Sequence, residues 1–305
     1  MDFTAGIITY NRPQYVKRLL RSLDGQTVTP DEIVIVDDSD NRQTQEVISE
    51  FSDESDIPVR SFYSQGKTIQ GTARNRIIEE AEGDVICFLD DDTVCSDGWL
   101  EAIEETYREN PDAAGVGGPA LDVNEDLELL HDIERNEESQ CTVNRYGEIE
   151  DRSDVWVPPR TVEVDLFRGA NMSFRKDILE QIGGFDPGYG GNGWREETDV
   201  MAALRERGGK LLYNPEARVN HIQADSGGAR MYGKEFWYWG ARNHTRFLKK
   251  HFSERLYLSL LMTMFSTKGD LPPVWKLPLK AIQGDYQVLQ VFRGYIEGYR
   301  QKVKT

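Results

Sequence analysis

The stretch Gly83–Leu100, GDVICFLDDDTVCSDGWL, decides the fold. Its residues 85–89 form a continuous apolar run, which is typical of a strand buried on both faces of a parallel sheet. The run ends in Asp90, Asp91 and Asp92, whose ionised carboxylates repel each other unless a cation, donor groups or solvent offset their charge. Because Mg²⁺ and Mn²⁺ prefer oxygen ligands, the sequence points to a cation site, with a solvated acidic loop as the alternative.

Strands and helices alternate along the residues that precede this stretch. The apolar run 33–36 reads as a second buried strand, and it too ends in acid, at Asp37, Asp38 and Asp40. Such alternation predicts βαβ units and a mostly parallel sheet flanked by helices. We expect both acidic clusters at the carboxyl edge of this sheet, where open α/β sheets bind ligands. The pattern predicts strands at 3–9, 33–36, 59–63 and 85–89 and helices at 13–25, 44–51 and 72–81.

The residues after the central strand are less regular. Residues 122–154 are polar and poorly periodic, which we interpret as an insertion of helix and loop. Residues 188–193 are rich in glycine and aromatic side chains and predict a mobile loop. Further helices are expected at 99–108, 176–182 and 196–206, and strands at 115–118, 161–167, 210–213 and 217–221.

The composition limits the class of protein. No N-terminal segment reads as a signal peptide, and no run of 18 uncharged apolar residues occurs. Cys87, Cys95 and Cys141 lack zinc or disulfide spacing, which favours a reducing compartment and hence the cytoplasm. The net charge of −17 argues against a nucleic-acid partner for the acidic body.

Charge is unevenly distributed along the 305 residues. Residues 230–305 hold 14 Lys and Arg against 5 Asp and Glu, a net charge of +9, so the first 229 residues carry −26. We therefore expect an α/β domain over residues 1–228 and a basic, aromatic-rich helical extension over 229–305. Aromatic and cationic side chains on amphipathic helices suit a membrane interface, which predicts peripheral contact with the cytoplasmic face of a membrane. The alternative is a helical cap whose cations pair with the acidic domain.

Eight segments, taken in order, resemble the inverting glycosyltransferases of family 2. The resemblance covers about residues 3–225 and implies the GT-A fold, a Rossmann-like domain that binds nucleotide sugars. It further implies transfer of a sugar from a nucleotide-diphosphate donor to an acceptor hydroxyl. The segments are TYNRP (9–13), IVIVDDSD (33–40), GTARN (71–75), FLDDDTVCSDGWL (88–100), FRGANMSFRK (167–176), GGFD (183–186), EETD (196–199) and VNH (219–221).

The resemblance implies roles for residues at the sheet edge. Asp38 would accept hydrogen bonds from the nucleotide base, and Thr9 and Arg74 would lie around the base and the diphosphate. The segment at 90–92 matches the D-x-D motif of the family.

The same motif implies a metal site. Asp92 would bind a Mn²⁺ or Mg²⁺ ion that bridges the diphosphate oxygens, and His221 matches a position that often supplies a second ligand. Asp91 would lie near the ribose, with Asp90 in support.

The acidic pair Glu196-Glu197 matches the family's catalytic pair, whose second member is the general base. The pair is more often Glu-Asp in the family, so Glu197 has an arm one methylene longer. Gly169 and Asn171 match a segment whose small residues let a sugar approach the backbone. Trp194 is expected either to stack on the substrate or to pin the neighbouring loop. Acids in the first turn of a helix are also favoured by its dipole, an alternative explanation for the pair.

The residue types suit sugar transfer on chemical grounds. A metal held by carboxylates balances the charge of a leaving diphosphate, and a carboxylate in a pocket removes the acceptor's proton. The expected partners are a nucleotide sugar, with a UDP-sugar favoured, and a glycan or polyprenyl-linked acceptor. Two alternatives stay open: a phosphatase of the haloacid-dehalogenase type, with Asp90 as nucleophile and Asp92 as acid/base, and a non-catalytic nucleotide-sugar-binding protein.

Overall fold

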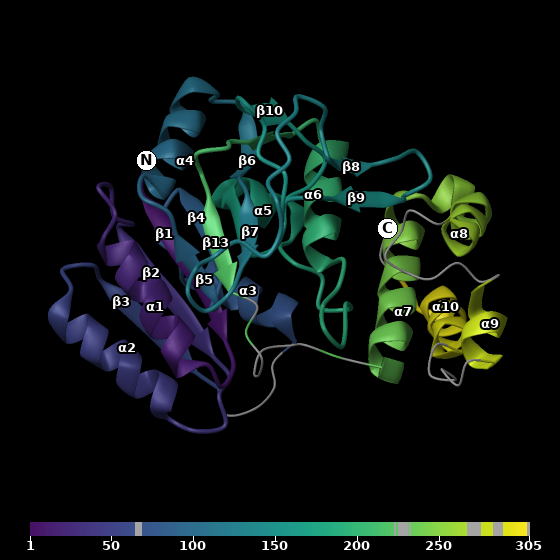
Figure 1. Ribbon diagram of the computed structural model, residues 1–305, viewed down its shortest axis with the longest axis horizontal. Coiled ribbons are helices and arrows are strands. Elements are labelled where there is room, and N and C mark those ends of the chain that lie inside the picture. The colour runs from purple at the N-terminus through teal and green to yellow at the C-terminus, as the bar shows by residue number, and fades with distance from the viewer. Residues whose placement is uncertain are drawn as a thin grey trace.

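The computed structural model describes residues 1–64, 69–222, 224, 231, 233–266, 276–282 and 289–303. An eight-stranded sheet forms its centre, in the order β10-β12-β6-β11-β4-β1-β2-β3 (Figure 1). The strands are β1 (Phe3–Thr9), β2 (Glu32–Asp37), β3 (Val59–Tyr63), β4 (Val85–Asp90), β6 (Ala113–Gly117), β10 (Val162–Glu163), β11 (Asn171–Arg175) and β12 (Lys210–Tyr213).

The strand directions confirm a mostly parallel sheet. Strand β1 pairs in parallel with both β2 and β4, and β2 pairs in parallel with β3. Strand β11 runs antiparallel between β4 and β6. The carboxyl ends of β1, β2 and β4 therefore lie next to each other, as the positions of the acidic residues predicted.

Helices cover both faces of the sheet, because alternate residues of its buried strands point to opposite sides. Ile33, Ile35 and Cys87 pack in one cluster with α1 (Pro13–Asp24), α2 (Gln43–Glu54) and α4 (Trp99–Glu109). Val34 and Phe88 pack in the other, with α3 (Gln70–Glu80), α5 (Lys176–Ile182) and α6 (Glu196–Glu206). The result is a three-layer α/β/α domain.

The prediction for residues 122–154 was wrong in part, because the structure contains no helix there. The segment begins within β7 (Ala120–Val123), which joins β5 (Thr93–Cys95) and β13 (Val219–Ile222) in a second sheet. It continues into the hairpin β8 (Cys141–Val143) and β9 (Ile149–Asp151). The side chain of Asn144 accepts hydrogen bonds from the backbone of Tyr146 and Glu148, and Gly147 has a φ of 79°. This turn chemistry, and not a helical period, specifies the segment.

Two other predicted elements are shorter in the structure. The strand predicted at 161–167 extends only over Val162–Glu163, since the backbone N–H of Asp165 turns away to donate to Cys141 of the hairpin. The sequence predicts a last helix that continues to about Lys304, but the helix ends at Arg300, and Lys304 lies outside the described residues.

The C-terminal region is helical, as predicted. Helix α7 (Gly233–His251) packs closely against α10 (Gln290–Arg300), where a side chain at Gly294 or Gly298 would collide with the backbone of α7. Helices α8 (Leu256–Phe265) and α9 (Leu277–Ile282) lie beside them, on the side of the molecule away from β3 (Figure 1). No helix in the described part of the chain is long and apolar enough to cross a membrane. The expected domain boundary after residue 228 lies outside the described residues.

Candidate active site

The first cluster of the site lies where β1 and β4 end. The hydroxyl of Thr9 donates to Oδ2 of Asp91 at 2.7 Å. Nη1 of Arg12 lies 2.8 Å from Oδ1 of Asp91 and 2.9 Å from Oδ2 of Asp92. All four residues are buried. A buried guanidinium is therefore one of the donor groups that offset the repulsion among the aspartates.

Arg12 was missed as a site residue, although it follows the first strand at the edge where the acids gather. Burial raises the pKa of Asp91 to about 6, and the charge of Arg12 opposes that rise. Burial also disfavours the charge of Arg12, but Asp91 and Asp92 together hold its pKa above the ordinary value. Arg12 therefore stays positively charged beside the two aspartates near neutral pH.

A second cluster of site residues connects the carboxyl end of β4 to β13. Asp90, Asp92 and His221 bring one ligand atom each within 4.8 Å of one another. Nε2 of His221 is 3.2 Å from Oδ1 of Asp92, and Nδ1 is 3.1 Å from Oδ1 of Asp122. Burial lowers the pKa of His221, but hydrogen bonds to Asp122 and Asp92 raise it overall. Asp122 in turn receives a hydrogen bond from Arg168 at 2.7 Å.

These residues fit a hard divalent cation. Carboxylate oxygens and an imidazole nitrogen are suitable ligands for Mn²⁺, and Asp122 orients the imidazole so that Nε2 faces the carboxylates. Both oxygens of Asp91 accept hydrogen bonds, from Thr9 and Arg12, whereas Oδ1 of Asp92 faces Nε2 of His221, the other candidate ligand. Asp90 and Asp92 are thus better placed than Asp91 to hold the ion.

A third cluster forms around Arg74 on α3. Its guanidinium contacts Glu196, lies 3.2 Å from Oε1 of Glu197 and lies 3.6 Å from Oδ1 of Asp90. Its ring-face contact with Phe185, at 5.5 Å, fixes it further. Arg74 therefore links the acidic pair at the start of α6 to the aspartates that end β4.

The two members of the acidic pair have different surroundings. Glu196 is fully buried, and its Oε2 has no hydrogen-bond partner among the described residues. Burial raises the pKa of Glu196 to about 8, against the opposing charge of Arg74. The side chain of Glu197 is 23% exposed. Burial thus favours the neutral form of Glu196, whereas Glu197 is the member of the pair that solvent and a substrate can reach.

The remaining predicted residues have distinct positions. Asp38 receives a hydrogen bond from Ser64 at 2.7 Å, and its backbone N–H donates to the carbonyl of Thr9. The amide of Asn171 donates to the carbonyls of Pro119 and Ala217 and accepts from the Trp99 indole. Both N–H groups of Asn171 are therefore engaged within the protein, which indicates a structural role.

Trp194 lies beside the C-terminal helices. Its ring stacks with the guanidinium of Arg195 at 4.1 Å and lies 6.4 Å from the ring of Phe236. The loop 188–193, predicted to be mobile, is held in place by α7. Trp239 packs on Gly190 and Gly191, and Asn243 donates to the carbonyl of Gly190 at 2.9 Å.

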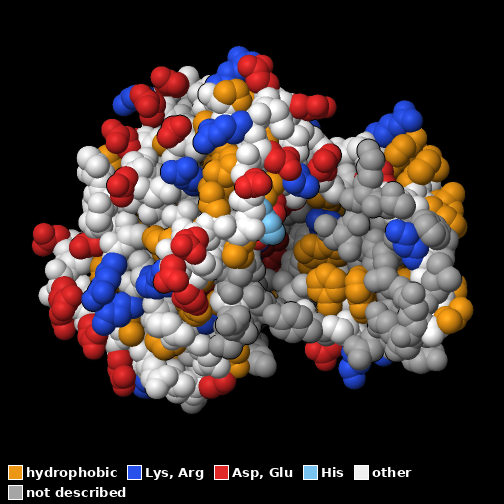
Figure 2. Space-filling view, viewed as in Figure 1, with side chains coloured by type: hydrophobic (Ala, Val, Ile, Leu, Met, Phe, Trp, Pro, Cys, Tyr) orange, Lys and Arg blue, Asp and Glu red, His pale blue; other side chains and the backbone are white. Residues whose placement is uncertain are grey.

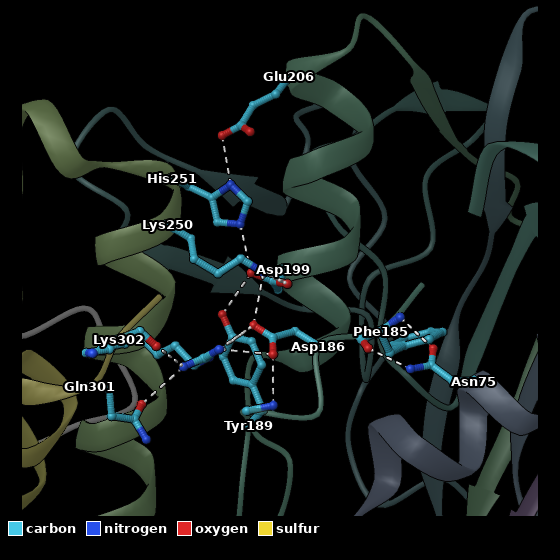
Figure 3. A network of polar contacts seen from close by, with 12 residues as sticks. Asn75, Phe185, Asp186, Tyr189, Asp199, Glu206, Lys250, His251, Gln301 and Lys302 are labelled. Carbon is cyan, nitrogen blue, oxygen red and sulfur yellow. Dashed lines mark hydrogen bonds and ion pairs between the residues drawn. The ribbon is translucent and has the colours of Figure 1, made fainter. Parts of the chain in front are cut away.

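An ion-pair network fastens α7 to the domain (Figure 3). Arg246 donates to both oxygens of Asp186, and Lys250 lies between Asp186 and Asp199. Nε2 of His251 is 2.9 Å from Asp199, a residue of the same helical turn as the acidic pair. The cations of α7 thus pair with acids of the domain, as the cap alternative expects.

Comparison with known proteins gives the family. The model of glycosyl transferase family 2 matches residues 4–183, more than half of the chain. The chain belongs to glycosyl transferase family 2. This family 2 enzyme transfers a sugar from a nucleotide sugar, and the phosphatase and non-catalytic alternatives are thereby excluded.

Two similar proteins act on glycans or lipid-linked sugars, by their names. A glucosyl-dolichyl phosphate glucuronosyltransferase of Haloferax volcanii is 29% identical over 230 residues, which are 72% of this chain and 69% of that protein. The O-antigen chain rhamnosyltransferase RfbN of Salmonella typhimurium is 25% identical over 224 residues, 72% of this chain and 66% of that protein.

Solved structures confirm the GT-A fold of the family 2 enzyme. GalNAc-T7 with UDP, GalNAc and Mn²⁺ aligns at a TM-score of 0.68 and 17% identity, over 96% of this chain and 56% of that one. The mannosyltransferase PcManGT of Pyrobaculum calidifontis, with GDP-Man and Mn²⁺, aligns at 0.59 and 15%, over 99% and 88%.

Substitution of Gly169 tests how strongly the rate of this family 2 enzyme depends on the position of the acidic pair. A methyl group at Gly169 would overlap Oε1 of Glu197 and lie 3.0 Å from its Cγ and Cδ. We expect Gly169→Ala to displace the carboxylate and lower kcat by about 100-fold, the effect typical of a 1 Å misplacement. KM for the donor should change little. Steady-state kinetics measure both, with Gly25→Ala as the control, since a methyl group there meets only ordinary contacts. An unchanged kcat would mean that the position of Glu197 does not limit the reaction.

Proposed function

We propose that this enzyme is a metal-dependent inverting glycosyltransferase, in which Glu197 acts as the general base. The observation that supports the proposal is a continuous chain of contacts through the site. Arg74 connects Glu197 to Asp90, and Asp90 shares the candidate metal cluster with Asp92 and His221. Donor, metal and base positions predicted from separate segments of the sequence are thus adjacent.

The donor-binding part of the site would lie at the carboxyl ends of β1 and β2. Asp38 accepts hydrogen bonds from the nucleotide base, and Thr9 positions Asp91 toward the ribose. Asp90, Asp92 and His221 would hold Mn²⁺ or Mg²⁺, which when bound supplies positive charge next to the leaving diphosphate. Arg74 pairs with Glu196, Glu197 and Asp90, and it therefore holds these three carboxylates in fixed positions relative to one another.

The acceptor end is formed by Glu197. Its carboxylate removes the proton from the acceptor hydroxyl as the hydroxyl attacks the anomeric carbon. One displacement, with the attacking and leaving oxygens on opposite faces of the sugar, inverts the anomeric configuration. The buried Glu196 contacts Arg74 beside the base, and Gly169 leaves the space that the longer Glu197 arm needs.

The acceptor class is proposed from the relatives. One of them acts on a glucosyl-dolichyl phosphate and another on an O-antigen chain, by their printed names. We therefore expect a lipid-linked sugar or a growing glycan as the acceptor, and we keep a UDP-sugar as the favoured donor of the sequence analysis.

A donor screen tests this function. Nucleotide sugars are added with Mn²⁺ or Mg²⁺ and the thermal unfolding of the protein is followed. A cognate donor at 100 times its Kd stabilises the native state by about 2.7 kcal/mol. The product formed from that donor is then examined by proton NMR, where an anomeric configuration opposite to that of the donor is expected. Retention of configuration would contradict the single displacement, and stabilisation without metal would contradict the metal requirement.

A further inference from the structure

Large apolar side chains are exposed on the three C-terminal helices. Of the fifteen exposed large hydrophobic residues in the described chain, ten lie between residues 257 and 299. On α8 the most exposed are Tyr257 at 75%, Leu261 at 53% and Phe265 at 53%. Figure 2 shows apolar side chains along the edge of the molecule formed by these helices. We call this set the α8–α10 face; it comprises Tyr257, Leu258, Leu261, Met262, Phe265, Ile282, Leu289, Phe292, Ile296 and Tyr299.

The α8–α10 face belongs to a folded unit. The rings of Tyr257 and Tyr299 are 6.3 Å apart and their hydroxyls 3.0 Å apart, so the exposed sides of α8 and α10 adjoin. Beneath them, Val291 and Tyr295 of α10 are buried against Ala241 of α7. Exposed large apolar side chains gathered on one folded helical unit are typical of a protein or membrane interaction site.

The charges around the face favour a lipid surface over a second copy of the chain. Residues 251–305 hold 8 Lys and Arg against 4 Asp and Glu, whereas residues 1–250 carry a net charge of −21. Arg300 is exposed on α10 and Arg255 is exposed immediately before α8, while the exposed Arg293 of α10 pairs with Glu297 of the same helix. Two copies meeting face to face would bring these basic groups together, whereas an anionic bilayer would attract them and repel the rest of the molecule.

The dimensions suit a helix lying in the interface. Helix α8 has ten residues and no charged side chain, so it is about 15 Å long, half of the ~30 Å hydrocarbon core. We propose that the α8–α10 face docks the enzyme peripherally on an anionic lipid bilayer, with α8 parallel to the surface. Docking would place the catalytic domain beside acceptors that are anchored in the same membrane.

Vesicle flotation of the 305-residue protein tests this without substrate or metal, so its outcome is independent of the proposed reaction. Vesicles of phosphatidylcholine alone are compared with vesicles containing 30% phosphatidylglycerol, on the order of the anionic content that attracts basic segments. We expect binding to the anionic vesicles to be at least tenfold stronger. The triple variant Leu261→Ser, Phe265→Ser and Ile296→Ser should lose at least tenfold in binding, since these side chains are 53%, 53% and 51% exposed on the α8–α10 face.

The matched control removes exposed apolar groups elsewhere. Leu129 and Leu130 are 47% and 46% exposed on the catalytic domain, and Leu129→Ser with Leu130→Ser should leave binding unchanged. Circular dichroism checks that all variants are folded. The proposal is overturned if the wild-type protein does not bind anionic vesicles or if the triple variant binds as well as the wild type. It is also overturned if light scattering shows a wild-type dimer that the triple variant dissociates, because the face would then bind a second copy.

Discussion

Replacing Glu197 by Gln is expected to lower the rate of sugar transfer by about 10²–10⁴-fold, the usual contribution of a general base. Gln has nearly the same shape, so the space beside Gly169 stays filled and the contact with Arg74 is retained as a hydrogen bond. The amide cannot accept the acceptor's proton. Donor binding should persist, because the proposed base acts on the acceptor hydroxyl and not on the nucleotide.

Two measurements separate this result from a loss of folding. Calorimetric titration with the donor and Mn²⁺ should give a Kd close to that of the wild type, while the transfer assay shows the loss. Glu180→Gln, an exposed residue of α5, provides the control. Full turnover by Glu197→Gln would show that the base assignment is wrong, and Glu196→Gln in the same assay would then show whether the buried member of the pair acts instead.

Replacing Asp92 by Ala is expected to abolish metal-dependent donor binding. Asp92 contributes one of the three ligand atoms that lie within 4.8 Å of one another, and it also contacts both Arg12 and His221. Its removal leaves a two-residue metal site. It also removes one of the two carboxylates that raise the pKa of His221, so we expect the imidazole to titrate at lower pH.

Manganese titration followed by electron paramagnetic resonance measures the metal affinity directly. Asp92→Asn is the companion variant, because it keeps the shape of the side chain and its ability to bond Arg12. Asp97→Ala, an exposed acid in the same motif, should bind Mn²⁺ as the wild type does. Wild-type affinity in both Asp92 variants would place the metal elsewhere.

The sequence predicted the sheet and the edge that bears the site, because both depend on local patterns. Residues 85–89 and 33–36 are apolar without interruption since both faces of each strand are covered by helices. The acids that follow must then meet at the carboxyl edge of the parallel strands. The order and direction of the strands leave few possible positions for these acids. Asp38 and Asp92, which are far apart in the sequence, could therefore be predicted to lie at the same edge of the sheet.

Which charged side chains pair with one another in the site could not be predicted in the same way. Arg12 pairs with aspartates about 80 positions away, and Arg74, expected near the diphosphate, contacts an acidic pair more than 120 positions away. A local pattern shows that such side chains are available but not which of several acids each will meet. Asp122 was hidden for another reason, since it lies in a segment interpreted as an insertion, yet β7 brings it to His221.

The attachment of α7 has a consequence for the size of the folding unit. The family model ends at residue 183, but Asp186 and Asp199 depend on Arg246, Lys250 and His251 for their counter-charges. A chain truncated before α7 would leave these carboxylates without cations and uncover the loop that leads into Glu196 and Glu197. The segment that the family model matches is therefore smaller than the part held together by these ion pairs, and we expect a minimal active fragment to extend at least through His251.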